Sequence, residues 1–233
     1  DPGIWIFSST DNAHYNYNSR YLFEYVKDNL PEITPYFVIN DEKLRKKLGD
    51  KYGKQYFIET CSIEGMKKAL SAGVWFTSAG LPVYGTGLGK NRTIVNLWHG
   101  IPLKKIALMD PNLSRLARIY FKKIFTENYT FVLTCSSRLI PVMAESFQIS
   151  PDKIKVWGQP RNDKLFEKIN KAREEGLKVS FDVYPYNAGM TSLSAMLPPW
   201  MFEGGVDKMV ERLTDEKNRK QIDHEIENGL PAW

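Results

Sequence analysis

The chain has 233 residues, of which 42% are hydrophobic and 25% are charged, and its formal net charge is +5. This composition is ordinary for a soluble globular protein with a sizeable core, and no run approaches the roughly 20 apolar residues of a membrane-spanning helix. No signal peptide is visible, and because the sequence starts at Asp1 without Met, we expect a fragment or a processed chain. The two cysteines, Cys61 and Cys135, lie far apart, which favours free thiols in a reducing compartment over a disulfide framework.

The charge is spread unevenly along the chain. Residues 1–170 contain 24 Lys and Arg against 16 Asp and Glu, a net charge of +8, whereas residues 171–233 contain 8 against 11, a net charge of −3. A basic first part suits an anionic partner such as a membrane surface, a nucleotide or a phosphate polymer. The change of sign predicts two domains, 1–170 and 171–233.

Apolar and β-branched runs predict strands that alternate with helices over the first 170 residues. Ser19 and Ser62 are the expected N-caps of the first and third helices, because a serine hydroxyl can accept a bond from a free helical N–H. Strands that alternate with helices predict an α/β fold with a doubly wound parallel sheet. The strands are expected at 4–7, 36–39, 56–58, 74–77, 93–95, 131–134 and 154–157. The helices are expected at 19–30, 41–54, 62–72, 113–125 and 163–175, and one more follows the strand at 131–134 and ends at about residue 147.

The strand at 93–95 is followed by a break in the pattern, and His99 lies where the strand gives way to a loop. Gly100 permits backbone angles that other residues avoid, and ligands bind at the carboxyl ends of strands in open α/β sheets. An imidazole can take a proton from a hydroxyl near neutral pH, and Lys104 and Lys105 could hold phosphate oxygens. His99 is therefore a candidate general base, in a cleft lined by the loops after the strands at 4–7 and 131–134. The alternative is a structural histidine held by hydrogen bonds.

Two serines add a potential anion site. Ser136 and Ser137 follow the strand at 131–134 and precede the next helix. Free N–H groups at the start of a helix attract anions, so these hydroxyls could contribute to phosphate binding.

The helix expected at 113–125 has an apolar face and a basic face. This pattern is typical of a surface helix docked on the sheet, and the alternative is an interfacial helix that lies on anionic lipid. In the second case, the basic side chains would reach the lipid headgroups. The apolar face contains Leu113, Leu116, Ala117, Tyr120 and Ile124, and the basic residues are Arg115, Arg118, Lys122 and Lys123.

Three segments carry a resemblance to a known family. They are Trp98-His99-Gly100-Ile101-Pro102-Leu103-Lys104-Lys105, Asn18-Ser19-Arg20-Tyr21-Leu22-Phe23-Glu24-Tyr25 and Gly158-Gln159-Pro160-Arg161-Asn162-Asp163. Over residues 3–168 they are similar to motifs of the CDP-glycerol glycerophosphotransferases, which polymerise teichoic acids on the inner face of the bacterial membrane. Ile101 stands where this family usually has threonine. The resemblance implies the acceptor-side, Rossmann-like half of a two-domain glycosyltransferase of the B type.

The resemblance also implies a reaction and a site. His99 would deprotonate the terminal hydroxyl of a glycerol phosphate acceptor, whose oxygen would attack the phosphorus of CDP-glycerol next to the glycerol, and CMP would leave. No cofactor is implied beyond the donor substrate CDP-glycerol, although the polyol could also be ribitol. The implied partners are a polymeric or lipid-linked acceptor and an anionic membrane surface, with no nucleic acid, and the implied location is cytoplasmic, peripheral on the inner face of the cell membrane. The residues expected to bind substrate or phosphate are Trp98, Gly100, Lys104, Lys105 and Arg161 from the motifs, together with Ser136 and Ser137 from their position before a helix.

Residues 171–231 resemble a different family, the N-acyl-D-amino-acid deacylases, which are zinc-dependent amidohydrolases with a TIM-like barrel. None of that family's metal-ligand motifs occurs in the sequence, and His224 is expected on a solvated helix, so amidohydrolase activity is not expected. The chain thus resembles two truncated genes joined by fusion, assembly error or design. Transferase activity is expected to be impaired because the donor-binding elements have no counterpart in the sequence.

Two alternatives to the transferase remain: a non-catalytic module that binds membrane or polyanion, and an inactive fragment of a zinc amidohydrolase. Whatever its origin, the second domain is expected to pack on the first. The pattern of residues 179–184 predicts a strand. We expect this strand to join the parallel sheet near the strand at 154–157 through a right-handed crossover. Residues after about 187 are predicted to form a loop and one or two helices.

Overall fold

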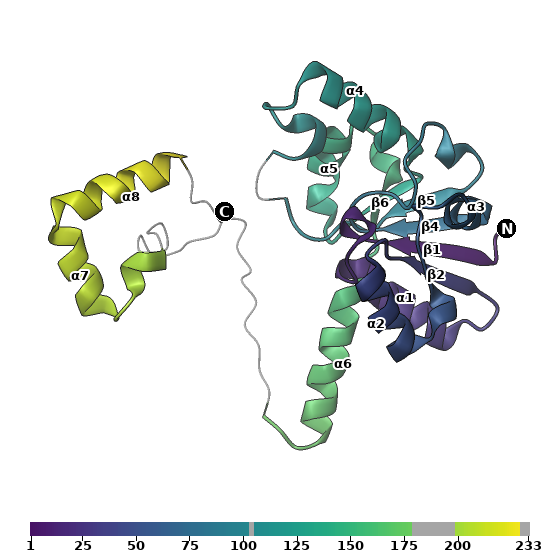
Figure 1. Cartoon of the computed structure of the whole chain (residues 1–233), viewed down its shortest axis with the longest axis horizontal. Helices are drawn as coiled ribbons and strands as arrows, with labels where there is room; N and C mark the ends of the chain where they lie inside the picture. The colour runs from purple at the N-terminus through teal and green to yellow at the C-terminus, as the bar shows by residue number, and fades with distance from the viewer. Residues whose placement is uncertain (103–104, 179–198, 229–233) are drawn as a thin grey trace. The chain divides into compact units, whose positions relative to one another are not determined.

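The computed structural model describes residues 1–102, 105–178 and 199–228 (Figure 1). Contacts between residues divide the chain into two units, Asp1–Val179 and Ser180–Trp233, and each is described by itself. The boundary expected at residue 170 falls inside a helix of the first unit, α6 (Pro160–Glu174). The strand predicted at 179–184 lies outside the described residues.

A parallel seven-stranded sheet forms the centre of the first unit. All seven strands predicted within residues 1–170 are present, and every pair of neighbours is parallel, which confirms the predicted α/β fold. The spatial order is β3-β2-β1-β4-β5-β6-β7, so the direction of winding reverses between β1 and β4. The strands are β1 (Ile4–Ser8), β2 (Thr34–Val38), β3 (Phe57–Ile58), β4 (Val74–Thr77), β5 (Thr93–Asn96), β6 (Phe131–Thr134) and β7 (Ile154–Val156).

The helices follow the strands as the sequence predicts, with one correction at the first helix. Ser62 caps the third helix, because its hydroxyl accepts a hydrogen bond from the N–H of Gly65. Ser19, in contrast, is not an N-cap: the helix already starts at Tyr17, and Ser19 lies buried in its first turn. The helices of this unit are α1 (Tyr17–Asn29), α2 (Glu42–Tyr52), α3 (Ile63–Ser71), α4 (Arg115–Ile124), α5 (Ile140–Phe147) and α6.

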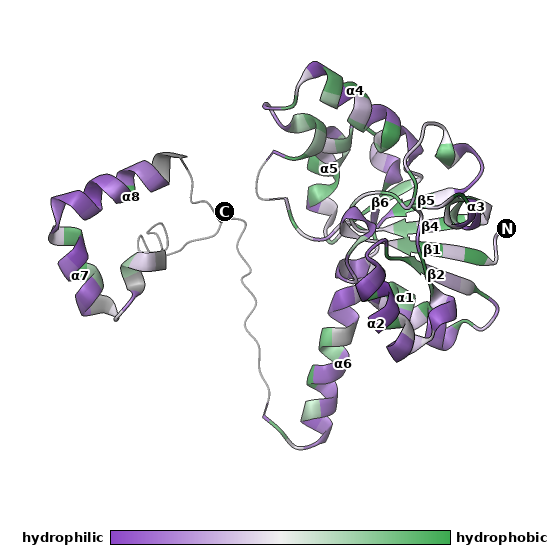
Figure 2. Ribbon diagram, viewed as in Figure 1, coloured by the Kyte–Doolittle hydropathy of each residue, from purple (hydrophilic) through white to green (hydrophobic). Residues whose placement is uncertain are grey.

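Helices cover both faces of the sheet, because successive side chains of a strand point to opposite sides. On β1, Ile6 belongs to the core cluster shared with α3 and α5, whereas Phe7 belongs to the cluster shared with α1 and α2. The hydropathy colours agree, since hydrophobic residues follow the strands and hydrophilic ones the outer sides of the helices (Figure 2).

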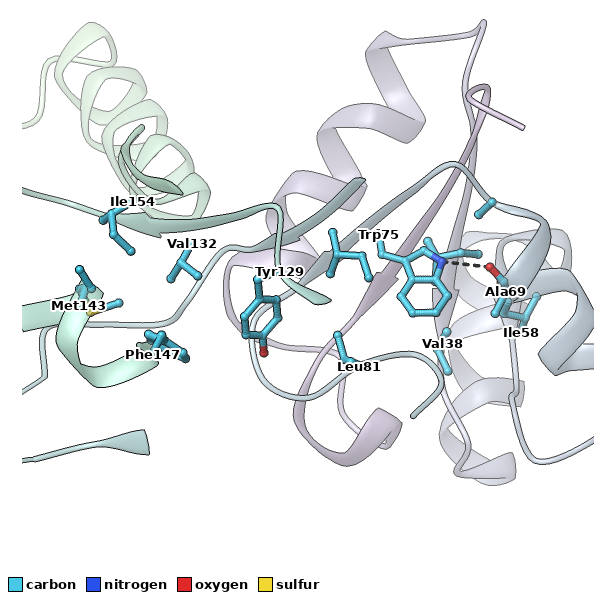
Figure 3. Packing of buried hydrophobic residues seen from close by; sticks show 14 residues of the cluster. Val38, Ile58, Ala69, Trp75, Leu81, Tyr129, Val132, Met143, Phe147 and Ile154 are labelled. Atoms are coloured by element: carbon cyan, nitrogen blue, oxygen red, sulfur yellow. Dashed lines mark hydrogen bonds between the residues drawn. The ribbon is translucent and has the colours of Figure 1, made fainter. Parts of the chain in front are cut away.

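Trp75 on β4 is the largest fully buried side chain of the core. Its indole nitrogen donates a hydrogen bond of 3.0 Å to the carbonyl oxygen of Ala69 on α3, which satisfies its one polar atom (Figure 3). Tyr129, Val132 and Phe147 continue the same cluster towards α5. The core therefore fixes the helices relative to the sheet, and with them the loops at the carboxyl edge.

The second unit contains a short 3-10 helix (Pro199–Phe202) and two α-helices, α7 (Val206–Thr214) and α8 (Glu216–Asn228). Met201 of the 3-10 helix and Ile222 of α8 are buried, and the indole of Trp200 donates to the carboxylate of Glu225 at 2.9 Å. The two helices agree with the prediction for this part of the chain. Among all the residues described, no helix has the length and apolar character needed to cross a membrane.

Candidate active site

His99 lies three residues beyond the end of β5, at the carboxyl edge of the sheet, as predicted. Its Nδ1 lies 2.9 Å from the carbonyl oxygen of Ser78, the first residue after β4. A carbonyl oxygen can only accept, so Nδ1 carries the hydrogen and the neutral ring has its lone pair on Nε2. In the part of the chain that the structure describes, no hydrogen-bond partner of Nε2 is found. The half-buried ring is thus oriented as a proton acceptor.

Two aromatic rings lie against the imidazole of His99. The ring of Tyr17 stacks on it with centroids 5.1 Å apart, and the ring of Trp98 lies 4.3 Å away. Both residues have a left-handed backbone, with φ of 54° for Tyr17 and 52° for Trp98. Such a conformation costs about 1–3 kcal/mol in a residue with a side chain, and it persists only where the surroundings hold it. Two of the six non-glycine residues with positive φ in the described part of the chain therefore contact His99.

Asn18 connects the loop of His99 to the start of α6. Its amide nitrogen donates to the carbonyl oxygens of Leu97 at 3.3 Å and Trp98 at 2.9 Å. Its amide oxygen accepts a hydrogen bond of 3.4 Å from the backbone N–H of Arg161, in the first turn of α6. Three segments that are far apart in the sequence therefore meet at one buried side chain.

The start of α1 is held in a similar way by a residue from another element. The hydroxyl oxygen of Ser78 accepts from the N–H of Ser19 at 2.9 Å and lies 2.8 Å from the Ser19 hydroxyl. The local N-cap residue, Asn16, makes no side-chain cap bond. Ser78 thus caps α1 through its hydroxyl and orients His99 through its carbonyl.

The remaining predicted site residues have fewer contacts with His99. Gly100 has open space where a side chain would stand, Lys105 is exposed, and Lys104 is not among the described residues. Ser136 and Ser137 follow β6 at the same edge of the sheet, but among the residues described no hydrogen bond or ring contact joins them to His99. Apart from its neighbour Trp98, the partners of His99 therefore come from the start of α1 and the loop after β4.

A cleft of about 710 Å³ lies between α1 and α6. Arg20, Tyr21, Tyr25 and Asp163 are among the residues that line it, and His99 is not. The cleft thus differs from the one predicted around the histidine, which was expected between the loops after β1 and β6.

Helix α4 is docked on the core and also exposes apolar side chains. Phe121 and Ile124 pack against the core cluster, whereas Leu116, with 79% of its surface exposed, Ile119 and Tyr120 face solvent. The apolar face predicted from spacing therefore points outward in part, because the chain docks through the second half of the helix. Arg115, Lys122 and Lys123 are exposed, and Lys123 pairs with Glu127 at 2.9 Å.

Arg118 is the exception among the basic residues of α4. Its guanidinium donates to the carbonyl oxygens of Leu108, Asp110 and Leu113, the last at 3.2 Å. These three bonds fasten the preceding loop to the helix. Arg118 therefore has a structural role in this chain, and the headgroup contact expected from its position on the basic face stays a prediction.

The sequence did not predict four residues of the site: Tyr17, Asn18, Ser19 and Ser78. Asn18 and Ser19 belong to a motif of the resemblance but were given no role in the site. Ser78 carries one usable signal, because it directly follows a predicted strand and so lies at the edge where ligands bind. Tyr17 has no comparable signal.

No group of three or more His, Cys, Asp or Glu side chains within residues 1–102, 105–178 and 199–228 could hold a metal ion.

Comparison with known proteins gives a family for this fold and site. Residues 1–183 match the model of the CDP-glycerol:poly(glycerophosphate) glycerophosphotransferases. The chain belongs to this family. The match ends at residue 183, and the resemblance of residues 171–231 to deacylases remains a prediction.

Curated relatives are similar to this chain in sequence, and solved structures are similar to it in fold. A teichoic acid poly(glycerol phosphate) polymerase of Bacillus spizizenii is 26% identical over 75% of this chain and 44% of its own length. A teichoic acid glycerol-phosphate transferase of Staphylococcus aureus is 34% identical over 34% of this chain and 21% of its own length. A histidine variant of the wall teichoic acid polymerase TagF shares the fold, with a TM-score of 0.61 and 21% identity over 78% of this chain and 45% of that one. The chain thus spans less than half the length of these relatives.

Proposed function

We propose that this chain takes part in the transfer of glycerol phosphate from CDP-glycerol to a glycerol phosphate or teichoic acid acceptor, at the inner face of the cell membrane. The chain corresponds to less than half of its relatives, so we assign to it the activation of the acceptor. The transferred group comes from CDP-glycerol itself, and the proposal requires no cofactor.

In the proposed reaction, Nε2 of His99 takes the proton of the acceptor's terminal hydroxyl. The oxygen attacks the phosphorus that carries the glycerol of CDP-glycerol, a new phosphodiester forms, and the bond to the CMP phosphate breaks, so that CMP leaves with the electron pair. Arg161, at the start of α6, and Lys105 neutralise charge on the phosphates, since phosphoryl transfer depends mainly on positioning and electrostatic stabilisation. Lys104 is proposed to assist them on the basis of its sequence position alone.

The observation that supports this role best is the hydrogen bond from Nδ1 of His99 to the Ser78 carbonyl. A general base must offer a lone pair in a fixed direction, and this bond selects the tautomer and the orientation of the ring that do so. The lysines and the arginine alone would serve a binding protein equally well.

The test is the release of CMP from CDP-glycerol in the presence of a glycerol phosphate acceptor. His99→Gln should lower kcat by about 100- to 10,000-fold, the usual contribution of a general base. His14→Gln is the matched control, because His14 is an exposed histidine whose Nδ1 also lies near a backbone carbonyl, that of Thr10. Equal CMP release by wild type and His99→Gln would refute the assignment.

A second candidate function, binding to anionic membrane, is favoured by the exposed surface of α4. Leu116, Ile119 and Tyr120 are exposed beside Arg115 and Lys122, which is the arrangement of a helix that inserts its apolar side into lipid. We propose that this surface holds the chain at the membrane while His99 acts on a lipid-linked acceptor.

Co-sedimentation with phosphatidylglycerol vesicles tests this second proposal. Replacing Arg115 and Lys122 with Glu should abolish binding, and raising the salt concentration should weaken the binding of wild type. Lys46→Glu with Lys47→Glu on α2 is the control, because both lysines are exposed and the charge change is the same. If both double variants bind like wild type, α4 is an ordinary docked helix.

A further inference from the structure

We propose that Asn18 is a positioning residue that ties the start of α6 to the loop of His99, so that the proton acceptor and the phosphate-binding turn keep a fixed relative position. The inference rests on the proposed function, which places His99 and Arg161 in one reaction. Asn18 itself touches neither substrate nor the imidazole; it acts through the backbone of its neighbours.

The first argument is that both ends of the Asn18 amide make hydrogen bonds. An asparagine side chain has two N–H donors and one carbonyl acceptor. The donors reach the carbonyl oxygens of Leu97 and Trp98, and the oxygen accepts from the N–H of Arg161. The side chain is fully buried, so water cannot replace a lost bond, and the two carbonyls fix which end of the amide faces them.

The second argument is where these bonds lead. The two bonds on the nitrogen side span 79 and 80 residues of sequence, and the bond on the oxygen side spans 143. Each ends beside a group of the proposed site: Trp98 precedes His99, and the bonded N–H belongs to Arg161 itself. The strained backbone of Trp98, with φ of 52°, shows that this loop needs an external restraint.

The third argument is that the two ends of the amide can be separated by substitution. Asn18→Asp has nearly the same shape and keeps an oxygen for the N–H of Arg161, but it places a carboxylate oxygen against the carbonyls of Leu97 and Trp98. Asn18→Ala removes all three bonds. If Asn18 only filled space, Asn18→Asp and Asn18→Ala would have the same effect on the site whenever they lowered stability equally.

The chain as it exists can be tested by NMR, without any turnover. Nitrogen-15 spectra report the tautomer of each of the three histidines, and the spectrum of His99→Gln identifies the signal of His99. Wild type is expected to show the Nδ1–H tautomer alone. Asn18→Asp and Asn18→Ala should show a mixture of both tautomers, because the loop before His99 is released.

Hydrogen exchange at the amide of Arg161 reports the other end of the connection. Exchange should become roughly tenfold faster in Asn18→Ala and stay close to wild type in Asn18→Asp. Arg161→Ala is the matched control at this end, because it removes the guanidinium and keeps the backbone N–H that Asn18 accepts. It should leave the tautomer of His99 unchanged.

Val26→Ala controls for stability. Val26 is buried on the same helix but packs in the core cluster shared with α2, away from the site. It should lower Tm and leave the His99 tautomer and the Arg161 amide as in wild type. The proposal is overturned if Asn18→Asp or Asn18→Ala lowers Tm in the same way and the His99 tautomer does not change.

CMP release separates the inference from the function on which it rests. Where wild type turns over, Asn18→Asp should lower kcat on the order of 100-fold with KM nearly unchanged, because a small misplacement of the base affects the transition state more than binding. A parallel rise in KM with constant kcat would overturn the positioning role. If wild type shows no turnover, the proposed function fails, and the NMR measurements alone decide on Asn18.

Discussion

Replacing Ser78 tests whether α1 is capped from the loop after β4. The oxygen of its hydroxyl accepts from the N–H of Ser19 and contacts the Ser19 hydroxyl, and both residues are fully buried. Ser78→Ala leaves two buried polar groups of Ser19 without a partner, each of which costs about 1–3 kcal/mol. Because a hydroxyl can turn towards other acceptors, we expect a total loss of about 2–4 kcal/mol in the free energy of unfolding.

Ser19→Ala provides the comparison, because it removes only one of the two contacts. The N–H of Ser19 then still donates to Ser78, so the loss should be about 1 kcal/mol. In the double variant only the N–H is unpaired, and the total should fall below the sum of the single losses by about 2 kcal/mol.

Urea unfolding at pH 7, followed by circular dichroism, measures all three values. A domain of this size is stable by about 5–15 kcal/mol, so each variant should remain folded and the slope of the urea dependence should not change. The reasoning is refuted if Ser78→Ala costs no more than Ser19→Ala, or if the two losses simply add.

Three further predictions concern the frame around the site. Arg118→Gln should lower the free energy of unfolding by about 1–3 kcal/mol without weakening vesicle binding, because the guanidinium holds backbone carbonyls; urea unfolding and co-sedimentation measure the two effects. Gly65→Ala should destabilise by about 3 kcal/mol in the same assay, since its new Cβ would lie 2.1 Å from the carbonyl oxygen of Glu59. The hydrogen bond from the Ser62 hydroxyl lowers the pKa of Glu59 below its ordinary value of 4.5. The ionised Glu59 side chain therefore stabilises the fold above pH 4.5, and this stabilisation is lost as the pH falls through the lowered pKa. Urea midpoints measured from pH 7 down to pH 3 should therefore fall less in Glu59→Gln than in wild type.

The sheet could be predicted from the sequence because its signals are local. Each strand is a short apolar run, such as residues 74–77, and buried parallel strands need no alternation. The cap at Ser62 was predicted correctly because its acceptor and donor lie three residues apart. Ser19 has the same residue type at a helix start, but its hydroxyl contacts a partner 59 residues away, and nothing in the local pattern indicates this.

The same difference separates the predictable and unpredictable parts of the site. The position of His99 at the sheet edge follows from a strand that ends just before it, which is a local feature. Its anchor is the carbonyl of Ser78, 21 residues earlier, and every residue type has such a carbonyl. A backbone acceptor leaves no mark in the sequence, so the orientation of the ring could be found only from the structure.

The energies around Asn18 explain why this orientation depends on a distant side chain. The left-handed backbone of Trp98 costs about 1–3 kcal/mol, and the two hydrogen bonds from Asn18 to this loop contribute about 0.5–1.5 kcal/mol each. The cost of the backbone conformation and the contribution of the two hydrogen bonds are of the same size, so without these bonds the loop has little to hold Trp98 in this conformation. Loss of the amide should therefore favour relaxation of Trp98 to an ordinary conformation, and the next residue along the chain is His99. A residue that never contacts the imidazole can in this way control where its lone pair points.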